Sequence, residues 1–124
     1  MTERTGHLGV IATVAAFTED VPFLDRCIAH LDTLRFTLQA LLEEHGLTQI
    51  QYAPPQAGFL AWLDCRALGL GEDPAAEFSR RGRVALNSGL AFGLPGASHV
   101  RLNFGTSTAI LDDVVRRMRA AANS

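Results

Sequence analysis

The segment HVRLNFGTS, at positions 99–107, places Arg101 in a run that alternates between polar and apolar residues. If this run forms a β-strand, His99, Arg101 and Asn103 share one face and the apolar residues share the other. A guanidinium presents forked donors that match a carboxylate in two parallel hydrogen bonds, and it stays charged at any working pH. Arg101 is therefore suited to bind the carboxylate of a small ligand.

The residues alone leave a second interpretation of this segment open. In that interpretation, Arg101 faces solvent or pairs with a structural acid, as many surface arginines do. For His99 and Asn103 we expect solvent exposure, because isolated polar residues on a strand are usually surface residues. The partners of the guanidinium in the structure distinguish the two interpretations of Arg101.

The composition limits which chemistry the chain performs. Its 124 residues, of which 48% are hydrophobic and 19% charged, predict a globular protein with one hydrophobic core. The formal net charge of −2 gives no electrostatic reason to expect a nucleic acid or an anionic membrane as a partner. All eleven cationic side chains are arginine and none is lysine, so the chain has no lysine amine with which to form a Schiff base.

The two cysteines, Cys27 and Cys65, are too far apart in sequence for the paired spacing of a zinc site. We expect both to be buried as small hydrophobic residues, and we predict neither a disulfide framework nor a metal site. The longest apolar run is too short to cross a bilayer, and the N-terminal segment MTERTGHLGV lacks the pattern of a signal peptide. A cytoplasmic location is the expectation.

Two consecutive helices are expected to open the chain. The segment GHLGVIATVAAF is apolar around most of a helical circumference, so residues 1–19 are predicted to contain a helix that needs cover on several sides. Asp20 and Pro22 are suited to start a second helix, apolar residues follow at spacings of three and four, and Gly46 is suited to end it. A helix over roughly residues 20–45 would be about 39 Å long.

The rest of the chain is predicted to form an α+β domain, in which helices pack on one side of a small, mainly antiparallel sheet of three to four strands. QIQYAPPQAG alternates briefly, and GFLAWLDC, residues 58–65, is an unbroken apolar run that predicts a strand buried on both faces. A short helix is expected from Asp73 to Gly82, and a third strand in RVALNSG. The loop LAFGLPGAS, the strand with Arg101 and a final helix capped by Ser107 follow.

Three segments, AGFLAWLDCRALGL, GRVALNSGLAFG and HVRLNFGTS, occur in an order and spacing that resemble the C-terminal part of fold-type-I, pyridoxal-phosphate-dependent aminotransferases. The resemblance is closest to the cystathionine β-lyase-like (C–S lyase) branch, and it covers nearly the whole chain. It implies that residues 1–19 match the end of the large domain, residues 20–46 the linking helix and residues 47–124 the small domain.

The same resemblance implies roles for site residues. In that family, the arginine of the strand before the last helix binds the α-carboxylate of the amino-acid substrate, and the matching residue is Arg101. Asn87, Ser88 and Gly89 match the segment before a loop that approaches the substrate, and we assign them no catalytic role. The implied cofactor is pyridoxal phosphate (PLP), and the implied partners are an amino-acid carboxylate and the missing large domain.

The chain departs from the family where the cofactor is held. The lysine of the internal aldimine, the cup for the cofactor phosphate, the aspartate at the pyridine nitrogen and the aromatic ring over the cofactor have no counterpart in it. We therefore expect no covalently bound PLP and no activity from this chain alone. The apolar helix of residues 8–17 would be left exposed, which predicts homo-oligomerisation.

Three functions are compatible with these observations. The first is the C-terminal domain of a PLP-dependent aminotransferase or C–S lyase, and the choice between these two activities depends on residues outside the chain. The second is a non-catalytic remnant that acts as a binding or assembly module. The third, an amino-acid-binding regulatory domain of the ferredoxin-like type, is disfavoured because that fold does not open with two consecutive helices.

Overall fold

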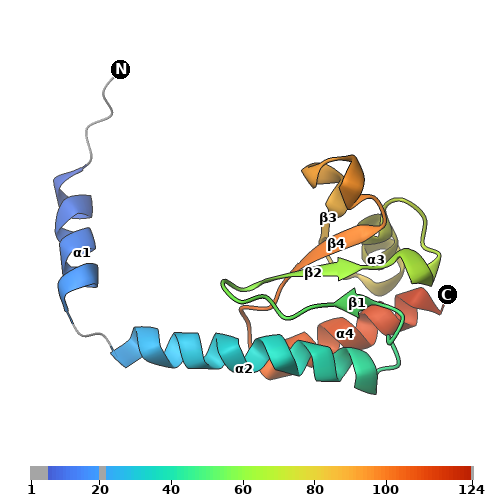
Figure 1. Ribbon diagram of the computed structural model, residues 1–124, viewed down its shortest axis with the longest axis horizontal. Helices are drawn as coiled ribbons and strands as arrows, with labels where there is room; N and C mark the ends of the chain where they lie inside the picture. Colours follow the sequence, from blue (N-terminus) through green and yellow to red (C-terminus); the bar gives the residue numbers. More distant parts are fainter. Residues whose placement is uncertain (1–5, 20–21, 124) are drawn as a thin grey trace. The chain divides into compact units, whose positions relative to one another are not determined.

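A computed structural model of the chain describes residues 6–19 and 22–123. The chain divides into two compact units, Met1–His30 and Leu31–Ser124. Its helices and strands follow one another in the predicted order (Figure 1). These elements are α1 (His7–Thr18), α2 (Pro22–Glu44), β1 (Gln51–Tyr52), β2 (Leu60–Asp64), η1 (Arg66–Leu68), α3 (Pro74–Gly82), β3 (Asn87–Ser88), η2 (Gly89–Phe92), η3 (Leu94–Gly96), β4 (His99–Asn103) and α4 (Thr108–Ala122).

The first helix, α1, consists mostly of apolar residues and buries none of them. Leu8 and Phe17, near its two ends, are 81% and 87% exposed. The prediction of a helix that is apolar around its circumference is therefore confirmed for the described residues. Asp20, which was expected to cap the second helix, lies outside the described residues.

The second helix, α2, is 23 residues long, which corresponds to about 35 Å and is close to the predicted length. Gly46 ends it as predicted, with a positive φ of 71°, and the Leu47 N–H donates to the Leu42 carbonyl at 2.8 Å. No single helix in residues 6–19 and 22–123 is long and apolar enough to cross a membrane. Among the described residues, α1 and α2 reach the required length and hydropathy when they are taken together as a bent pair.

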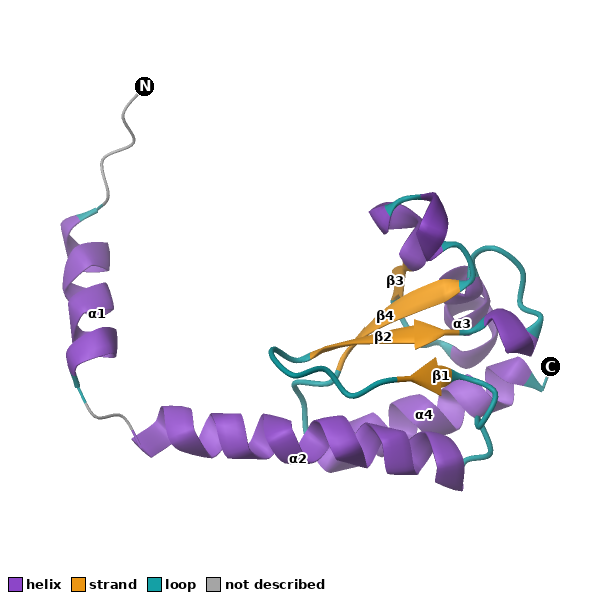
Figure 2. Cartoon of the chain, in the orientation of Figure 1, coloured by secondary structure: helices purple, strands orange, loops and turns teal. Residues whose placement is uncertain are grey.

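The second unit contains a four-stranded antiparallel sheet with the strand order β1-β2-β4-β3 (Figure 2). Because β4 lies between β2 and β3, Arg101 has a direct cross-strand neighbour on each side, Trp62 and Asn87. The C-terminal half of α2 and the whole of α4 run along the same face of this sheet (Figure 1). The predicted α+β class, with helices on one side of a small antiparallel sheet, is confirmed.

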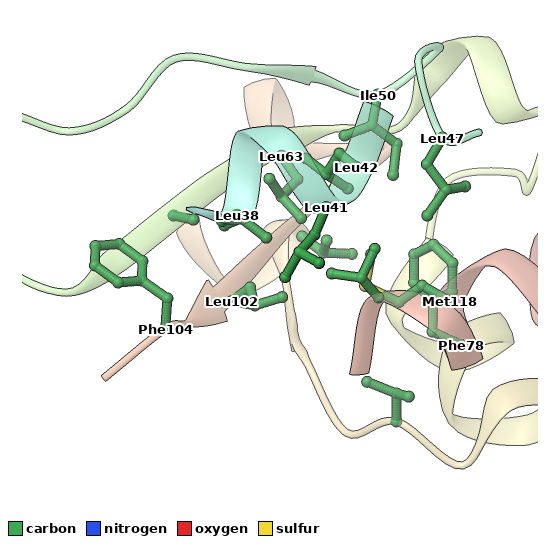
Figure 3. Close-up of a cluster of buried hydrophobic side chains, with 14 of the residues drawn as sticks. Leu38, Leu41, Leu42, Leu47, Ile50, Leu63, Phe78, Leu102, Phe104 and Met118 are labelled. Atoms are coloured by element: carbon green, nitrogen blue, oxygen red, sulfur yellow. The ribbon is translucent and has the colours of Figure 1, made fainter. Parts of the chain in front are cut away.

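The hydrophobic core lies between these helices and one face of the sheet (Figure 3). In β4, Val100 and Leu102 are 0% and 2% exposed, and they belong to the core face that the alternation predicted. The helices contribute many of the other large core side chains, among them Leu34, Leu38, Phe78, Leu111, Val115 and Met118. Burial of Val100 and Leu102 fixes the register of β4, and thereby places Arg101 on the opposite face.

The prediction that GFLAWLDC is a strand buried on both faces is wrong. Burial alternates along β2: Ala61 and Leu63 are fully buried, whereas Leu60 and Trp62 are 41% and 40% exposed. The reason is that helices cover a single face of the sheet, so that half of an uninterrupted apolar run points away from the core. The outer face of the sheet therefore carries apolar side chains next to its polar ones.

Three smaller expectations also differ from the structure. In RVALNSG only Asn87–Ser88 pairs with the sheet, because the Val84 N–H donates to the Phe78 carbonyl at the end of α3 instead. The loop LAFGLPGAS contains two short 3₁₀ helices, η2 and η3. Cys65 is buried as predicted, but Cys27 is only partly buried, because it lies in a stretch of α2 that precedes the core.

Candidate carboxylate-binding site

Arg101 lies in the middle of the outer face of the sheet. Trp62 on β2 and Asn87 on β3 are its cross-strand neighbours, and His99 precedes it on the same face of β4. Phe92, from η2, also reaches the guanidinium. Residues of β2, β3 and η2 thus surround one cationic side chain of β4.

An amide and an aromatic ring hold the guanidinium of Arg101. Its Nη2 donates to Oδ1 of Asn87 at 3.3 Å, and its Cζ lies 4.6 Å from the centroid of the Phe92 ring. A guanidinium is attracted by the negative face of an aromatic ring, and its plane is well suited to stacking. Among the residues that the structure describes, no carboxylate forms an ion pair with Arg101. Within that part of the chain, the interpretation of Arg101 as half of a structural salt bridge is therefore wrong.

The guanidinium retains hydrogen-bond donors for a ligand. It has five N–H groups in total. The Nε of Arg101 is buried without a partner, and one hydrogen of Nη2 is engaged by Asn87. Three N–H groups on Nη1 and Nη2 remain, and two are sufficient for the paired hydrogen bonds of a carboxylate.

Three rings form an aromatic group beside Arg101: Trp62, Phe92 and His99. The centroids of Trp62 and Phe92 are 5.6 Å apart at an interplanar angle of 81°, an edge-to-face contact, whereas Trp62 and His99 stack at 5.5 Å and 20°. The expectation of an exposed His99 is wrong, since its side chain is only 14% exposed. The stack on Trp62 and a 2.7 Å hydrogen bond between Nδ1 and the Ala97 carbonyl keep it against the sheet.

The acid on this face, Asp64, is already paired with another arginine. Arg66 Nη2 lies 2.6 Å from Asp64 Oδ2, and this hydrogen bond is the main reason that the pKa of Asp64 is lowered to about 2. Asp64 is therefore ionised at neutral pH. His99 Nε2 lies 3.8 Å from the same oxygen, Oδ2. Because Arg66 neutralises Asp64, this acid does not compete with a ligand for Arg101.

Two buried glycines fix the loop that carries Phe92. A Cβ on Gly89 would lie 2.1 Å from the carbonyl oxygen of Gly96, and a Cβ on Gly96 would lie 2.0 Å from that of Gly89. The two backbones are therefore in direct contact, and only glycine fits at either position. Ser88 adds a hydrogen bond, since its Oγ accepts from the Leu90 N–H at 3.3 Å.

The structure brings some of the predicted site residues together and separates others. Asn87 touches Arg101, whereas Ser88 and Gly89 support the following loop. Asn103 shares the face of Arg101 as predicted, but its Oδ1 accepts from the Gly105 N–H at 2.9 Å and closes a turn. Sequence reasoning missed Phe92, because no periodicity or motif indicates that a loop residue folds back onto a strand.

Comparisons with known proteins show which proteins the chain resembles. No family model matches the sequence. The chain is 45% identical to a "Putative cystathionine beta-lyase" of Mycobacterium tuberculosis, over 95% of this chain and 34% of that protein. It is 34% identical to the cystathionine beta-lyase PatB of Bacillus subtilis, over 90% of this chain and 29% of that protein. The crystal structure of a "putative plp-dependent beta-cystathionase" from Corynebacterium diphtheriae matches with a TM-score of 0.86 and 31% identity, over 98% of this chain and 32% of that one.

The chain belongs to the fold-type-I family of PLP-dependent proteins. It corresponds to a C-terminal part of this family and spans about a third of the length of the relatives it matches. Another solved structure that the chain resembles, at 25% identity and a TM-score of 0.86, is that of a "PLP-bound putative aminotransferase" from Clostridium difficile. The residues of this chain do not fit covalent attachment of PLP, because the fold-type-I cofactor is held as a Schiff base with a lysine and the sequence has no lysine.

Proposed function

We propose that this chain is the C-terminal small domain of a PLP-dependent C–S lyase or aminotransferase that acts on amino acids, and that Arg101 binds the α-carboxylate of the substrate. The observation that carries the proposal is the environment of the Arg101 guanidinium. Its guanidinium lies on the outer face of the sheet, is oriented by Asn87 and Phe92, and has no acidic partner among the described residues. The similarity to cystathionine β-lyases supports an amino acid as the source of the carboxylate.

In this proposal, residues 1–19 are the end of the large domain, residues 20–46 the linking helix and residues 47–124 the small domain. The large domain supplies the lysine and the rest of the cofactor site. Arg101 contributes position, because two hydrogen bonds to the carboxylate fix the orientation of the amino acid relative to groups outside this chain. Positioning of reactants lowers barriers by about 7–11 kcal/mol at the upper end of measured effects.

Binding of a carboxylate by the chain itself tests this role. Replacing Arg101 by glutamine is expected to weaken the binding of L-alanine at least about tenfold, because paired, charge-assisted hydrogen bonds are lost. Chemical-shift titration of the ¹⁵N-labelled chain measures the affinity. L-Alaninamide, which lacks the carboxylate, is the matched ligand, and Arg80→Gln is the matched protein, because it removes an equal charge on α3. Equal affinities of the wild type and Arg101→Gln, or of the two ligands, would contradict the proposal.

A second prediction follows from the absence of lysine in the sequence. After incubation with PLP and dialysis, the chain alone is expected to show no aldimine absorbance and no lyase or aminotransferase activity, because no side chain can hold the cofactor covalently. An absorbance spectrum and an assay of the dialysed sample check this result. A yellow species that survives dialysis would show that the argument from composition is wrong.

The lack of lysine also suits the second function, a non-catalytic binding or assembly module. Both functions use Arg101 in the same way, so carboxylate binding does not separate them. The genomic sequence before Met1 separates the two functions. A reading frame that continues upstream into a lysine-bearing cofactor domain would support the enzyme, whereas a translation start with no such neighbour would support the module.

We further propose that α1 is an association surface. Its apolar side chains are exposed on all sides, and Val14, in the middle of the helix, is 56% exposed. In the complete enzyme the large domain covers this helix, and in its absence a second copy of the chain does so. Homo-oligomerisation of the isolated chain is the consequence.

A further inference from the structure

Phe92 contributes to the candidate site, although no pattern in the sequence indicates that it does. Its ring lies over the Arg101 guanidinium, with 4.6 Å between the ring centroid and Cζ. We infer that Phe92 is a positioning residue, which holds the guanidinium in one plane and leaves only the terminal nitrogens Nη1 and Nη2 to receive a carboxylate. This inference rests on the proposed carboxylate-binding role of Arg101.

The hydrogen-bond state of Arg101 supports the inference. Its Nε is buried and has no hydrogen-bond partner, so a ligand cannot form the side-on pair of bonds that uses Nε and Nη2. Asn87 Oδ1 accepts from Nη2 at 3.3 Å and restrains the far end of the guanidinium. The ring and the amide together leave a fork between Nη1 and Nη2 as the geometry for a ligand.

The loop around Phe92 is built to hold the ring in place. The backbones of Gly89 and Gly96 are in contact, and the Gly93 N–H and Gly96 N–H donate to the carbonyls of Leu90 and Gly93 at 3.2 and 2.9 Å. From the other side, the ring makes an edge-to-face contact with Trp62 at 5.6 Å. Phe92 is thus restrained by its own loop and by β2, although its side chain is about half exposed.

Holding an arginine in advance of binding has a physical benefit. An arginine side chain loses conformational freedom when it is ordered by a ligand, and that loss subtracts from affinity. A guanidinium that is already stacked and tethered loses less on binding. Removal of the ring should therefore weaken carboxylate binding even though the ring itself does not contact the carboxylate.

The experiment compares three substitutions in the ¹⁵N-labelled full chain, with L-alanine as the ligand. Phe92→Leu keeps an apolar side chain and removes the ring, and it is expected to weaken binding about fivefold. It should also accelerate exchange of the Arg101 Nε–H with water at least about tenfold, because the ring no longer lies over the guanidinium. Phe92→Tyr keeps the ring and should restore both values to within about twofold of the wild type.

Leu90→Ala is the matched control, because Leu90 lies in the same 3₁₀ helix and is partly exposed but is not stacked on Arg101. It should bind L-alanine like the wild type. The Nε–H signal of Arg101 is assigned by its loss in Arg101→Gln. If Phe92→Leu misfolds, as its amide spectrum would show, Phe92→Met takes its place.

The outcomes separate this inference from the function on which it rests. Unchanged affinity and unchanged Nε–H exchange in Phe92→Leu, with binding lost in Arg101→Gln, would overturn the positioning role and leave the carboxylate site intact. Unchanged affinity in Arg101→Gln would overturn the carboxylate site itself. Weakened binding in Phe92→Leu, rescued by Phe92→Tyr, is the result that supports the inference.

Discussion

Replacing Gly96 by alanine is expected to lower the free energy of unfolding by about 3 kcal/mol, near the upper end for overpacking a well-packed site. A Cβ at this position would lie 2.0 Å from the carbonyl oxygen of Gly89, and backbone atoms cannot move aside as a flexible side chain can. The substitution forces η2 and η3 apart and so displaces Phe92 from Arg101. Urea denaturation measures the stability, and titration with L-alanine measures the effect on the site.

The control for this substitution is Gly9→Ala. Gly9 lies in α1, and a Cβ built on it meets no atom within 4 Å. Alanine is favoured over glycine inside a helix by about 0.5–1 kcal/mol, so this variant should be neutral or slightly more stable. Wild-type stability and wild-type binding in Gly96→Ala would show that the two backbones are not in contact in solution.

Charged residues in α1 are expected to weaken self-association of the chain about a hundredfold. Ile11 and Val14 are 52% and 56% exposed, and burying an aliphatic side chain of this size contributes about 1.5–3 kcal/mol. The double variant Ile11→Glu/Val14→Glu removes this contribution and places two charges where a partner would bind. Sedimentation equilibrium over a range of concentrations compares its dissociation constant with that of the wild type.

Thr13→Glu/Thr18→Glu is the matched variant for this comparison. Both threonines are exposed residues of α1, so the net charge and the helix are altered in the same way while the apolar side chains remain. We expect this variant to associate like the wild type, apart from a modest loss due to charge repulsion. A wild-type chain that stays monomeric at high concentration would contradict the assignment of α1 as an association surface.

Local signals in the sequence predicted the elements well. Ser107 is followed by a helix, and its Oγ accepts from the Ile110 N–H as an N-cap does. Pro74 and Gly46 mark a helix start and a helix end as predicted, because proline fixes φ at a value that suits the first turn and glycine readily adopts the positive φ that ends a helix. The alternation in β4 likewise predicted which face is buried, because Val100 and Leu102 have no other place to bury their side chains.

The failures arise where burial depends on other elements. The apolar residues of β2 do not reveal that helices cover only one face of the sheet, so Trp62 was expected in a core and is found at the surface. The surroundings of Arg101 depend on register and on a loop that returns to the sheet. Asn87 is adjacent only because β3 pairs with β4 at that register, and Phe92 only because Gly89 and Gly96 let the loop close. A single sequence reveals neither the register of β3 on β4 nor the closure of this loop.

The two outermost strands of the sheet, β1 and β3, are each only two residues long. The edge of a sheet presents unpaired N–H and C=O groups, onto which another chain can add a strand and start aggregation. Edges this short offer too few such groups for a stable added strand. An added strand is therefore disfavoured at β1 and at β3, whereas residues 60–62 of β2 extend beyond the two residues that pair with β1 and form the longer stretch of sheet edge.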